Sequence, residues 1–318
     1  MEYAVTYLRI VFCFTFGSVA YNGISSILRS VGDSKSPLYA LIVSALANTL
    51  LDILFILVFK LGVAGVAYAT ILSQILSAVL VLIFLLKKRK EIGLTNLSWR
   101  PERQFILQIL KTGFPAAFQS CMISLGGMSV QRLINSFGSS VMAAYAAVNR
   151  IDSVAIQVIV SIGTALSVFT GQNMGQHQFE RIKKALYQTL VVMVAASVII
   201  AFCVVCFRYQ LISLFLDKNA STEAIEVGAT YLSIIGIAYV IAGVMQSYQN
   251  VIRGAGDVNT CMVAGLTELA GRIVFAYLLS HFLGSTGIWI ATPISWGCGC
   301  VIPIIRYYSG KWKQKGFV

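Results

Sequence analysis

Long apolar runs separated by short polar connections dominate the chain, and this pattern predicts membrane-spanning helices. Each run exceeds the roughly 20 apolar residues that a helix needs to cross a bilayer. Cutting the runs at charged residues and turn signals predicts nine spans, at 4–28, 37–59, 63–86, 113–136, 142–169, 185–207, 229–252, 258–281 and 284–306. The pattern is typical of an all-α polytopic membrane protein.

The composition excludes a soluble globular protein. Of the 318 residues, 58% are hydrophobic and 11% are charged, whereas a soluble domain carries roughly 25% charged residues. The net charge of +12 would suggest a nucleic-acid partner if the basic residues formed one soluble patch, but most of them lie between apolar runs. We therefore predict a lipid bilayer, and no nucleic acid, as the chain's surroundings.

The basic residues predict the orientation of the chain in the membrane. Most of those in the connections fall on one side, including the basic residues of 87–112 and of the C-terminal tail. The opposite side holds Arg9, Lys60, Arg208 and Lys218. The positive-inside rule then places the C-terminus in the cytoplasm and the N-terminus outside.

An internal repeat relates spans one to three to spans seven to nine. NGISSILRSVGD at 22–33 aligns with NVIRGAGD at 250–257 at an offset of 224, and GVAGVAYATILS at 62–73 aligns with GSTGIWIATPIS at 284–295 at an offset of 222. An even number of spans separates the copies, so the repeat is parallel. Two halves related by an axis along the membrane normal are a transporter architecture.

The repeat also predicts the organisation of the chain into lobes. We expect three helices of an N-terminal lobe in 1–86, a cytoplasmic linker at 87–112 with a surface helix at 101–110, a six-helix C-terminal lobe in 113–308 and a basic cytoplasmic tail at 309–318. The counterpart of the first three C-terminal helices would precede Met1. We therefore expect a fragment that lacks three helices, the alternative being a shortened descendant.

Several stretches, in this order along the chain, resemble the multidrug and toxic compound extrusion (MATE) family. They are YLRI at 7–10, the turn at 22–33, SPLYALIVSALANTLLDILFI at 36–56, GVAGVAYAT at 62–70, TGFP at 112–115, TGQNMGQ at 170–176 and VIRGAGD at 251–257. The resemblance implies a two-lobe transporter of the cell (inner) membrane, in the DNA-damage-inducible-F-like branch, that needs no cofactor and uses H⁺ or Na⁺ as its coupling ion.

Asp52 lies in the middle of the second predicted span, where a carboxylate is costly and normally faces a cavity or an ion path. Asn48 lies one helical turn before it on the same face, and Thr70 on the next span could reach the same pocket. The resemblance implies that Asn48, Asp52 and Thr70 belong to a coupling-ion site. The alternative is that Asp52 is a structural hydrogen-bonding residue.

Polar residues of the C-terminal lobe are candidates for a substrate cavity. Asn149, Asp152 and Gln157 in the fifth span must face the protein interior or water. Glu268 and Arg272 are spaced to pair within the eighth span, either as a structural interlock or as cavity residues.

The repeat offset shows that the two lobes have diverged in one position and share a turn in another. Arg272 occupies the position of Asn48, and Ala276 that of Asp52, so the second copy lacks the carboxylate.

The RxxGD turns are predicted to be structural, since Gly permits the bend and the charged residues can tie loops to helix ends. These turns comprise Arg29, Gly32, Asp33, Arg253, Gly256 and Asp257.

Together these observations favour secondary active efflux of small organic cations by ion antiport and alternating access. The alternatives are a lipid-linked or polysaccharide flippase of the same superfamily, which would favour a more basic cavity, and a non-transporting fragment. We predict no enzyme, catalytic residue or metal site, because no nucleophile constellation or paired Cys and His motif occurs. A full-length protein is expected to be a monomer, whereas nine helices alone would require a dimer or a partner chain.

Overall fold

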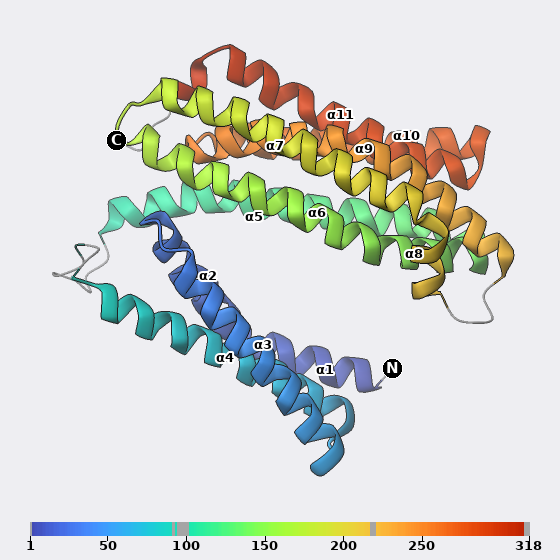
Figure 1. The fold of residues 1–318 in the computed structure, drawn as a ribbon, viewed down its shortest axis with the longest axis horizontal. Helices are drawn as coiled ribbons and strands as arrows, with labels where there is room; N and C mark the ends of the chain where they lie inside the picture. The colour runs from blue at the N-terminus through green and yellow to red at the C-terminus, as the bar shows by residue number, and fades with distance from the viewer. Residues whose placement is uncertain (1, 91–92, 94–101, 217–220, 315–318) are drawn as a thin grey trace. The chain divides into compact units, whose positions relative to one another are not determined.

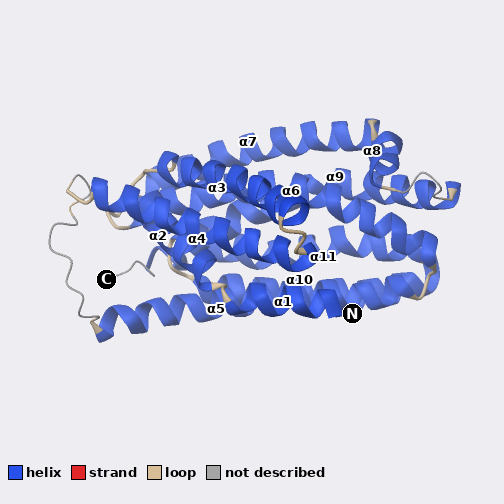
Figure 2. Cartoon of the chain, turned by 90° about the horizontal axis from the view of Figure 1, so that it is seen from below, coloured by secondary structure: helices blue, strands red, loops and turns tan. Residues whose placement is uncertain are grey.

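The computed structural model describes residues 2–90, 93, 102–216 and 221–314, and these residues form helices and loops without strands (Figures 1 and 2). The elements are α1 (Glu2–Cys13), α2 (Phe16–Ser30), α3 (Lys35–Ile53), the π-helix η1 (Leu54–Val58), α4 (Gly62–Lys88), α5 (Arg103–Asn135), α6 (Ser139–Met174), α7 (Phe179–Cys206), α8 (Arg208–Phe215), α9 (Thr222–Gly254), α10 (Val258–Leu283), α11 (Ser285–Tyr308) and the 3₁₀-helix η2 (Lys311–Gln314).

The predicted all-α membrane fold is confirmed, although the number of spans is approximate. Seven helices in the described part of the chain are long and apolar enough to cross a membrane, and the bent pair Val5–Cys13 and Phe16–Ser30 makes an eighth. The predicted span 113–136 lies within α5 except for Ser136, its C-cap; α5 is continuous there but is not among those seven. This part of α5 carries the polar residues Gln119, Gln131 and Arg132, which lower its mean hydropathy.

The segment predicted as a linker is partly helical. Residues 103–112 are the first turns of α5 and continue without a break through Pro115 into the predicted fourth span. The expected surface helix at 101–110 is thus the beginning of a longer helix. Of the remaining linker, 91–92 and 94–101 lie outside the described residues, as do the tail residues 315–318.

The chain divides into two compact units, residues 1–101 and 102–318. In the first unit, α1, α2 and α3 all pack against α4. Its small core contains Leu28 of α2, Ala40 of α3 and Val81 of α4. The helix α4 is therefore the element that holds this unit together.

The second unit is organised around α9. The helices α6, α7 and α11 pack directly against α9, while α10 packs against α11 and α5 (Figure 1). More than half of the apolar window of α9 is buried, a larger share than in any other candidate span of the described chain. Its contact with α6 is close, because a Cβ added at Gly254 would overlap the Ser167 carbonyl oxygen.

The repeat is visible in the backbone of the two RxxGD turns. Gly32 and Gly256 have φ values of 89° and 85°, a left-handed conformation that glycine adopts without strain. In both turns the backbone N–H of the following aspartate donates to a carbonyl five residues earlier, from Asp33 to Leu28 and from Asp257 to Ile252. Both helices therefore end in the same Schellman-type turn.

Each turn is fastened to the third helix of its own copy by an ion pair. Lys88 Nζ at the end of α4 lies 2.7 Å from Asp33 Oδ2, and Arg306 Nε near the end of α11 lies 2.6 Å from Asp257 Oδ2. Asp33 also accepts hydrogen bonds from the backbone and hydroxyl of Ser36. Partial burial alone would raise the pKa of Asp33, but the hydrogen bonds from Lys88 and Ser36 outweigh it and hold the pKa at about 2.

We expect Asp33→Asn to lower the thermal unfolding midpoint in detergent at neutral pH. Because the folded pKa lies below the ordinary 3.8, the stabilisation is present above about pH 4 and disappears as the pH falls toward about 2. The midpoint difference between wild type and variant, measured from pH 7 to pH 2, should therefore shrink in that window. A difference that stays constant throughout would contradict the ion pair.

Gly254→Ala should destabilise the second unit, because the added methyl group meets the Ser167 carbonyl where α9 crosses α6. Overpacking of this kind costs about 1–3 kcal/mol. The control is Gly127→Ala in α5, where the added Cβ has no neighbour within 4 Å. Chemical denaturation should separate the two variants, and equal midpoints would contradict the tight crossing.

Candidate functional site

Asn48 and Asp52 lie one turn apart on α3, with polar atoms that have no partner. Both side chains are partly buried, and neither Asn48 Nδ2 nor Asp52 Oδ1, each shielded from solvent, has a hydrogen-bond partner. An unsatisfied buried acceptor on an acid is costly, and in a membrane helix the cost is larger than in water. The pair therefore has one free donor and one free acceptor available for a ligand.

Thr70 lies on α4, the helix against which α3 packs. Its hydroxyl donates to the Val66 carbonyl of its own helix at 2.9 Å. The Thr70 oxygen therefore retains acceptor capacity, since a hydroxyl accepts as well as donates.

A π-helix begins just after Ile53, the residue that follows Asp52. Residues Leu54–Val58 form η1, and the Phe59 amide donates to the Leu54 carbonyl. π-turns within α-helices are rare and frequently occur at functional sites. Gly65 at the start of α4 packs closely against this segment, since a Cβ there would lie 3.0 Å from Phe55 Cβ.

The second copy of the repeat makes the same interhelical contact without the π-turn. Gly287, the counterpart of Gly65, approaches Leu279, the counterpart of Phe55. Yet α10 remains α-helical from Val258 to Leu283, and the counterpart of Asp52 is the buried Ala276. The π-turn thus occurs in the copy that carries the carboxylate.

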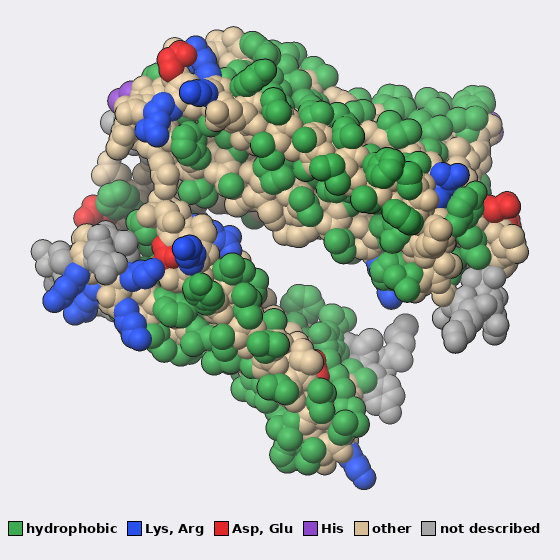
Figure 3. Space-filling view, in the orientation of Figure 1, with side chains coloured by type: hydrophobic (Ala, Val, Ile, Leu, Met, Phe, Trp, Pro, Cys, Tyr) green, Lys and Arg blue, Asp and Glu red, His purple; other side chains and the backbone are tan. Residues whose placement is uncertain are grey.

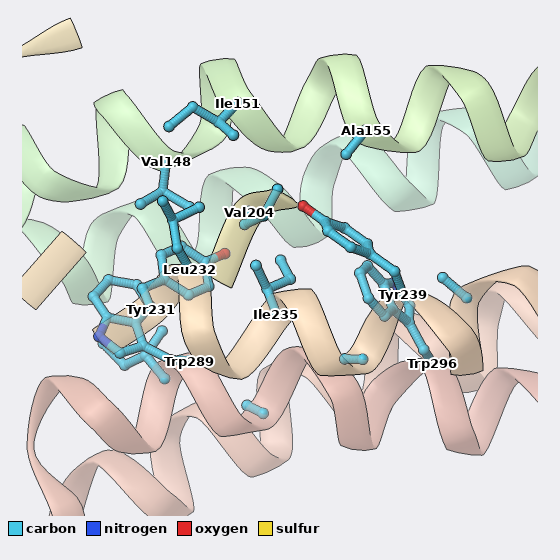
Figure 4. Packing of buried hydrophobic residues seen from close by; sticks show 14 of the residues in the cluster. Val148, Ile151, Ala155, Val204, Tyr231, Leu232, Ile235, Tyr239, Trp289 and Trp296 are labelled. Atoms are coloured by element: carbon cyan, nitrogen blue, oxygen red, sulfur yellow. The ribbon is translucent and has the colours of Figure 1, made fainter. Parts of the chain in front are cut away.

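A small polar cavity of about 50 Å³ lies inside the second unit, between α6, α9, α10 and α11. Among its lining residues are Asn149 and Asp152 of α6 and Arg272 of α10. The hydroxyl of Tyr239 on α9 donates to Asp152 Oδ1 at 3.0 Å, and Figure 4 shows this ring directed toward α6.

Aromatic rings form one wall of this cavity. Tyr231 and Trp289 stack with their centroids 4.2 Å apart, and Tyr145 lies nearly parallel to both (Figure 4 shows Tyr231 and Trp289). Stacked rings offer a face to a cation. Sequence reasoning did not select Tyr231, Tyr239 or Trp289 as site residues, although the eight-residue spacing of the two tyrosines puts them on one face of α9.

Glu268 and Arg272 form the ion pair that their spacing predicts. Arg272 Nη2 lies 3.2 Å from Glu268 Oε1, and the side chain of Glu268 is 8% exposed. Arg272 also lines the cavity together with Asp152, so its guanidinium group interacts electrostatically with both carboxylates. Neither Gln157 nor Glu268 is among the cavity residues: the side chain of Gln157 is exposed on α6, and Glu268 is buried beside Arg272. Within the described residues no group of three His, Cys, Asp or Glu side chains could hold a metal ion.

Arg272→Met should destabilise the second unit by about 3–5 kcal/mol, because it leaves the buried Glu268 carboxylate without its partner. The double variant Glu268→Gln with Arg272→Met should regain most of that loss. Arg132→Met, an exposed arginine on α5, is the matched control. Thermal unfolding in detergent measures all three, and a double variant as unstable as Arg272→Met alone would contradict the pairing.

Comparison with known proteins identifies the family. The chain is 32% identical over 311 residues to the probable multidrug resistance protein YpnP of Bacillus subtilis, and 29% identical over 322 residues to the probable multidrug resistance protein YoeA of the same organism. Each alignment covers 98% of this chain and 69% of the relative.

A solved structure, described as the outward-facing conformation of a multidrug resistance MATE family transporter of the MOP superfamily, shares the fold. Its TM-score is 0.89 at 22% identity, over 98% of this chain and 70% of that one. The MatE family profile matches residues 1–54 and 115–278. The resemblance found in the sequence is therefore confirmed, and the chain belongs to the MatE family of membrane transporters.

Proposed function

We propose that the protein carries out multidrug efflux as a secondary active transporter, exchanging small organic cations for H⁺ or Na⁺ by alternating access. Membership of a transporter family and the multidrug-resistance relatives support efflux.

The observation that carries the proposal is the unpartnered pair Asn48 and Asp52 beside the π-turn. Asp52 Oδ1 is a free acceptor at membrane depth. A proton or a sodium ion bound there removes or balances a charge that is otherwise costly in a low-dielectric medium. Binding and release of the ion at this carboxylate would therefore change the free energy of the state that faces one side of the membrane relative to the state that faces the other.

The π-turn could convert ion binding at Asp52 into a change of helix geometry. Its backbone hydrogen bonds run from i to i+5 and so differ from those of the flanking α-helix, and we propose that loading of Asp52 alters this turn. Since η1 contacts the start of α4 at Gly65, a change at Asp52 would be transmitted to α4 and Thr70. A ligand shifts such an equilibrium only by its differential affinity for the two states.

The cavity of the second unit supports a cationic substrate. Asp152 and Arg272 line the cavity, and the charge of Arg272 is already balanced by its pairing with Glu268. Asp152 is therefore the carboxyl group beside the aromatic rings that could pair with a cation. Acidic and aromatic groups together recognise organic cations. A volume of about 50 Å³ is too small for a drug-sized ligand, so the cavity would have to widen for substrate to enter.

The same residues distinguish the alternatives. A flippase for anionic lipid-linked sugars would need basic residues in the cavity, whereas Arg272 is already paired with Glu268. We further propose a cell-membrane location with the C-terminus in the cytoplasm and the N-terminus of this chain outside. Two alternatives remain: the chain does not transport, or it transports only with a partner chain. Efflux measured after reconstitution of the chain alone tests both.

Asp52→Asn should abolish ion-driven efflux of a fluorescent cation while leaving membrane insertion intact, because the amide cannot cycle between charged and neutral forms. Efflux is measured in proteoliposomes with an imposed H⁺ or Na⁺ gradient. Thr49→Val, which alters an exposed neighbour, is the control and should retain efflux.

Unchanged efflux in Asp52→Asn at equal expression would remove Asp52 from the mechanism. Absence of efflux in the wild-type chain under both gradients would instead favour the non-transporting alternative.

A further inference from the structure

A groove of about 440 Å³ lies at one end of the second unit, away from the cavity described above. Its walls are the start of α7, with Lys183, Leu186 and Tyr187, and the end of α11 with the following residues up to Lys313. Both α7 and α11 pack against α9, and Tyr248 of α9 lines the groove between them.

Aromatic packing fixes the wall that follows α11. Trp312 is 1% exposed, stacks on Tyr307 and donates from Nε1 to the Tyr307 carbonyl at 2.9 Å. The Trp312 ring also meets Phe179 at the start of α7, edge to face. Lys313 Nζ lies 5.6 Å from the centre of the Phe179 ring, so its charge is held at the mouth of the groove rather than free in solution.

The mouth of the groove is strongly basic. Lys183 and Lys313 line it, and basic side chains gather at this end of the second unit (Figure 3). Glu180 is the acid beside them, paired with Lys183 at 2.6 Å, but its side chain is 83% exposed. An exposed pair of this kind is weak, so Lys183 remains available to an anion. The basic residues nearby are Arg181, Lys184 and Lys311.

The remaining walls of the groove include apolar side chains of α7. Leu186 and Leu190 line it, and the flank of α7 continues with the exposed Val191, Val194 and Val198. Tyr187 and Tyr308, 71% and 73% exposed, line it as well. Exposed tyrosines beside lysines at the end of a membrane helix are typical of the headgroup level of a bilayer.

We infer that this groove binds one anionic phospholipid, with its phosphate between Lys183 and Lys313 and an acyl chain along Leu186 and Leu190. The basic mouth complements the phosphate, and basic pockets between membrane helices bind lipid headgroups of this kind. A soluble phosphate ion would use only the mouth and would leave the apolar part of the groove empty. The occupant assigned is therefore a lipid of the surrounding leaflet.

The test is native mass spectrometry of the full chain in detergent, titrated with dioleoyl phosphatidylglycerol and, separately, with dioleoyl phosphatidylcholine. Wild type should retain one phosphatidylglycerol in preference to phosphatidylcholine. Lys183→Gln with Lys313→Gln should weaken phosphatidylglycerol binding about thirtyfold, since each lysine near the headgroups is worth roughly fivefold. Lys184→Gln with Lys311→Gln removes the same charge outside the groove and should retain the tight lipid.

Glu180→Gln provides a variant that changes the groove in the opposite direction. It frees Lys183 from its acidic partner and should tighten phosphatidylglycerol binding a few fold. This result does not depend on the folding of the double lysine variant.

Several outcomes would overturn the inference. Equal losses in the two double variants would show that general charge, not the groove, holds the lipid. Displacement of phosphatidylglycerol by millimolar inorganic phosphate, with the same dependence on Lys183 and Lys313, would assign the site to a soluble anion instead. Binding of phosphatidylcholine as tightly as phosphatidylglycerol would remove the role of charge.

Discussion

Inside a membrane, a polar side chain must find its partner within the protein, and this constraint governs the placement of the charged residues. Glu268 is paired with Arg272, and Asp152 accepts from Tyr239. An unpaired polar group in the membrane interior costs several kcal/mol, which is a large part of the stability of a typical fold. Asn48 and Asp52 lie one turn apart on α3, and each has a buried polar atom without a partner, which is why we place the proposed ion site there.

The two copies of the repeat have the same turn and the same kind of ion pair, but their helices differ. Both have the left-handed glycine turn and the ion pair from that turn to the third helix. The first copy, however, has a bend of 46° between α1 and α2 and a π-turn after α3, where the second has the continuous helices α9 and α10. The two copies therefore share one framework but differ in the helices that carry the proposed ion site and the proposed substrate cavity.

The sequence predicts the features that depend on local periodicity. Apolar runs locate most spans, the repeat locates the paired turns, and the spacing of Glu268 and Arg272 predicts their contact. Contacts between distant segments are not predictable in this way. The bond from Tyr239 to Asp152 joins residues on different helices, and the groove around Trp312 needs the end of α11 to meet the start of α7.

The π-turn was also beyond sequence reasoning, because Leu54–Val58 contains neither glycine nor proline and nothing in it marks a change of helix type. A π-turn holds one residue more than an α-turn does, and each residue of an α-helix advances the chain by about 100° around the axis. Absorbing the extra residue would therefore rotate the helical residues on one side of η1 by about that angle relative to those on the other. The Asp52 side chain would then exchange one set of neighbours for another, with only a small displacement of the helix axis.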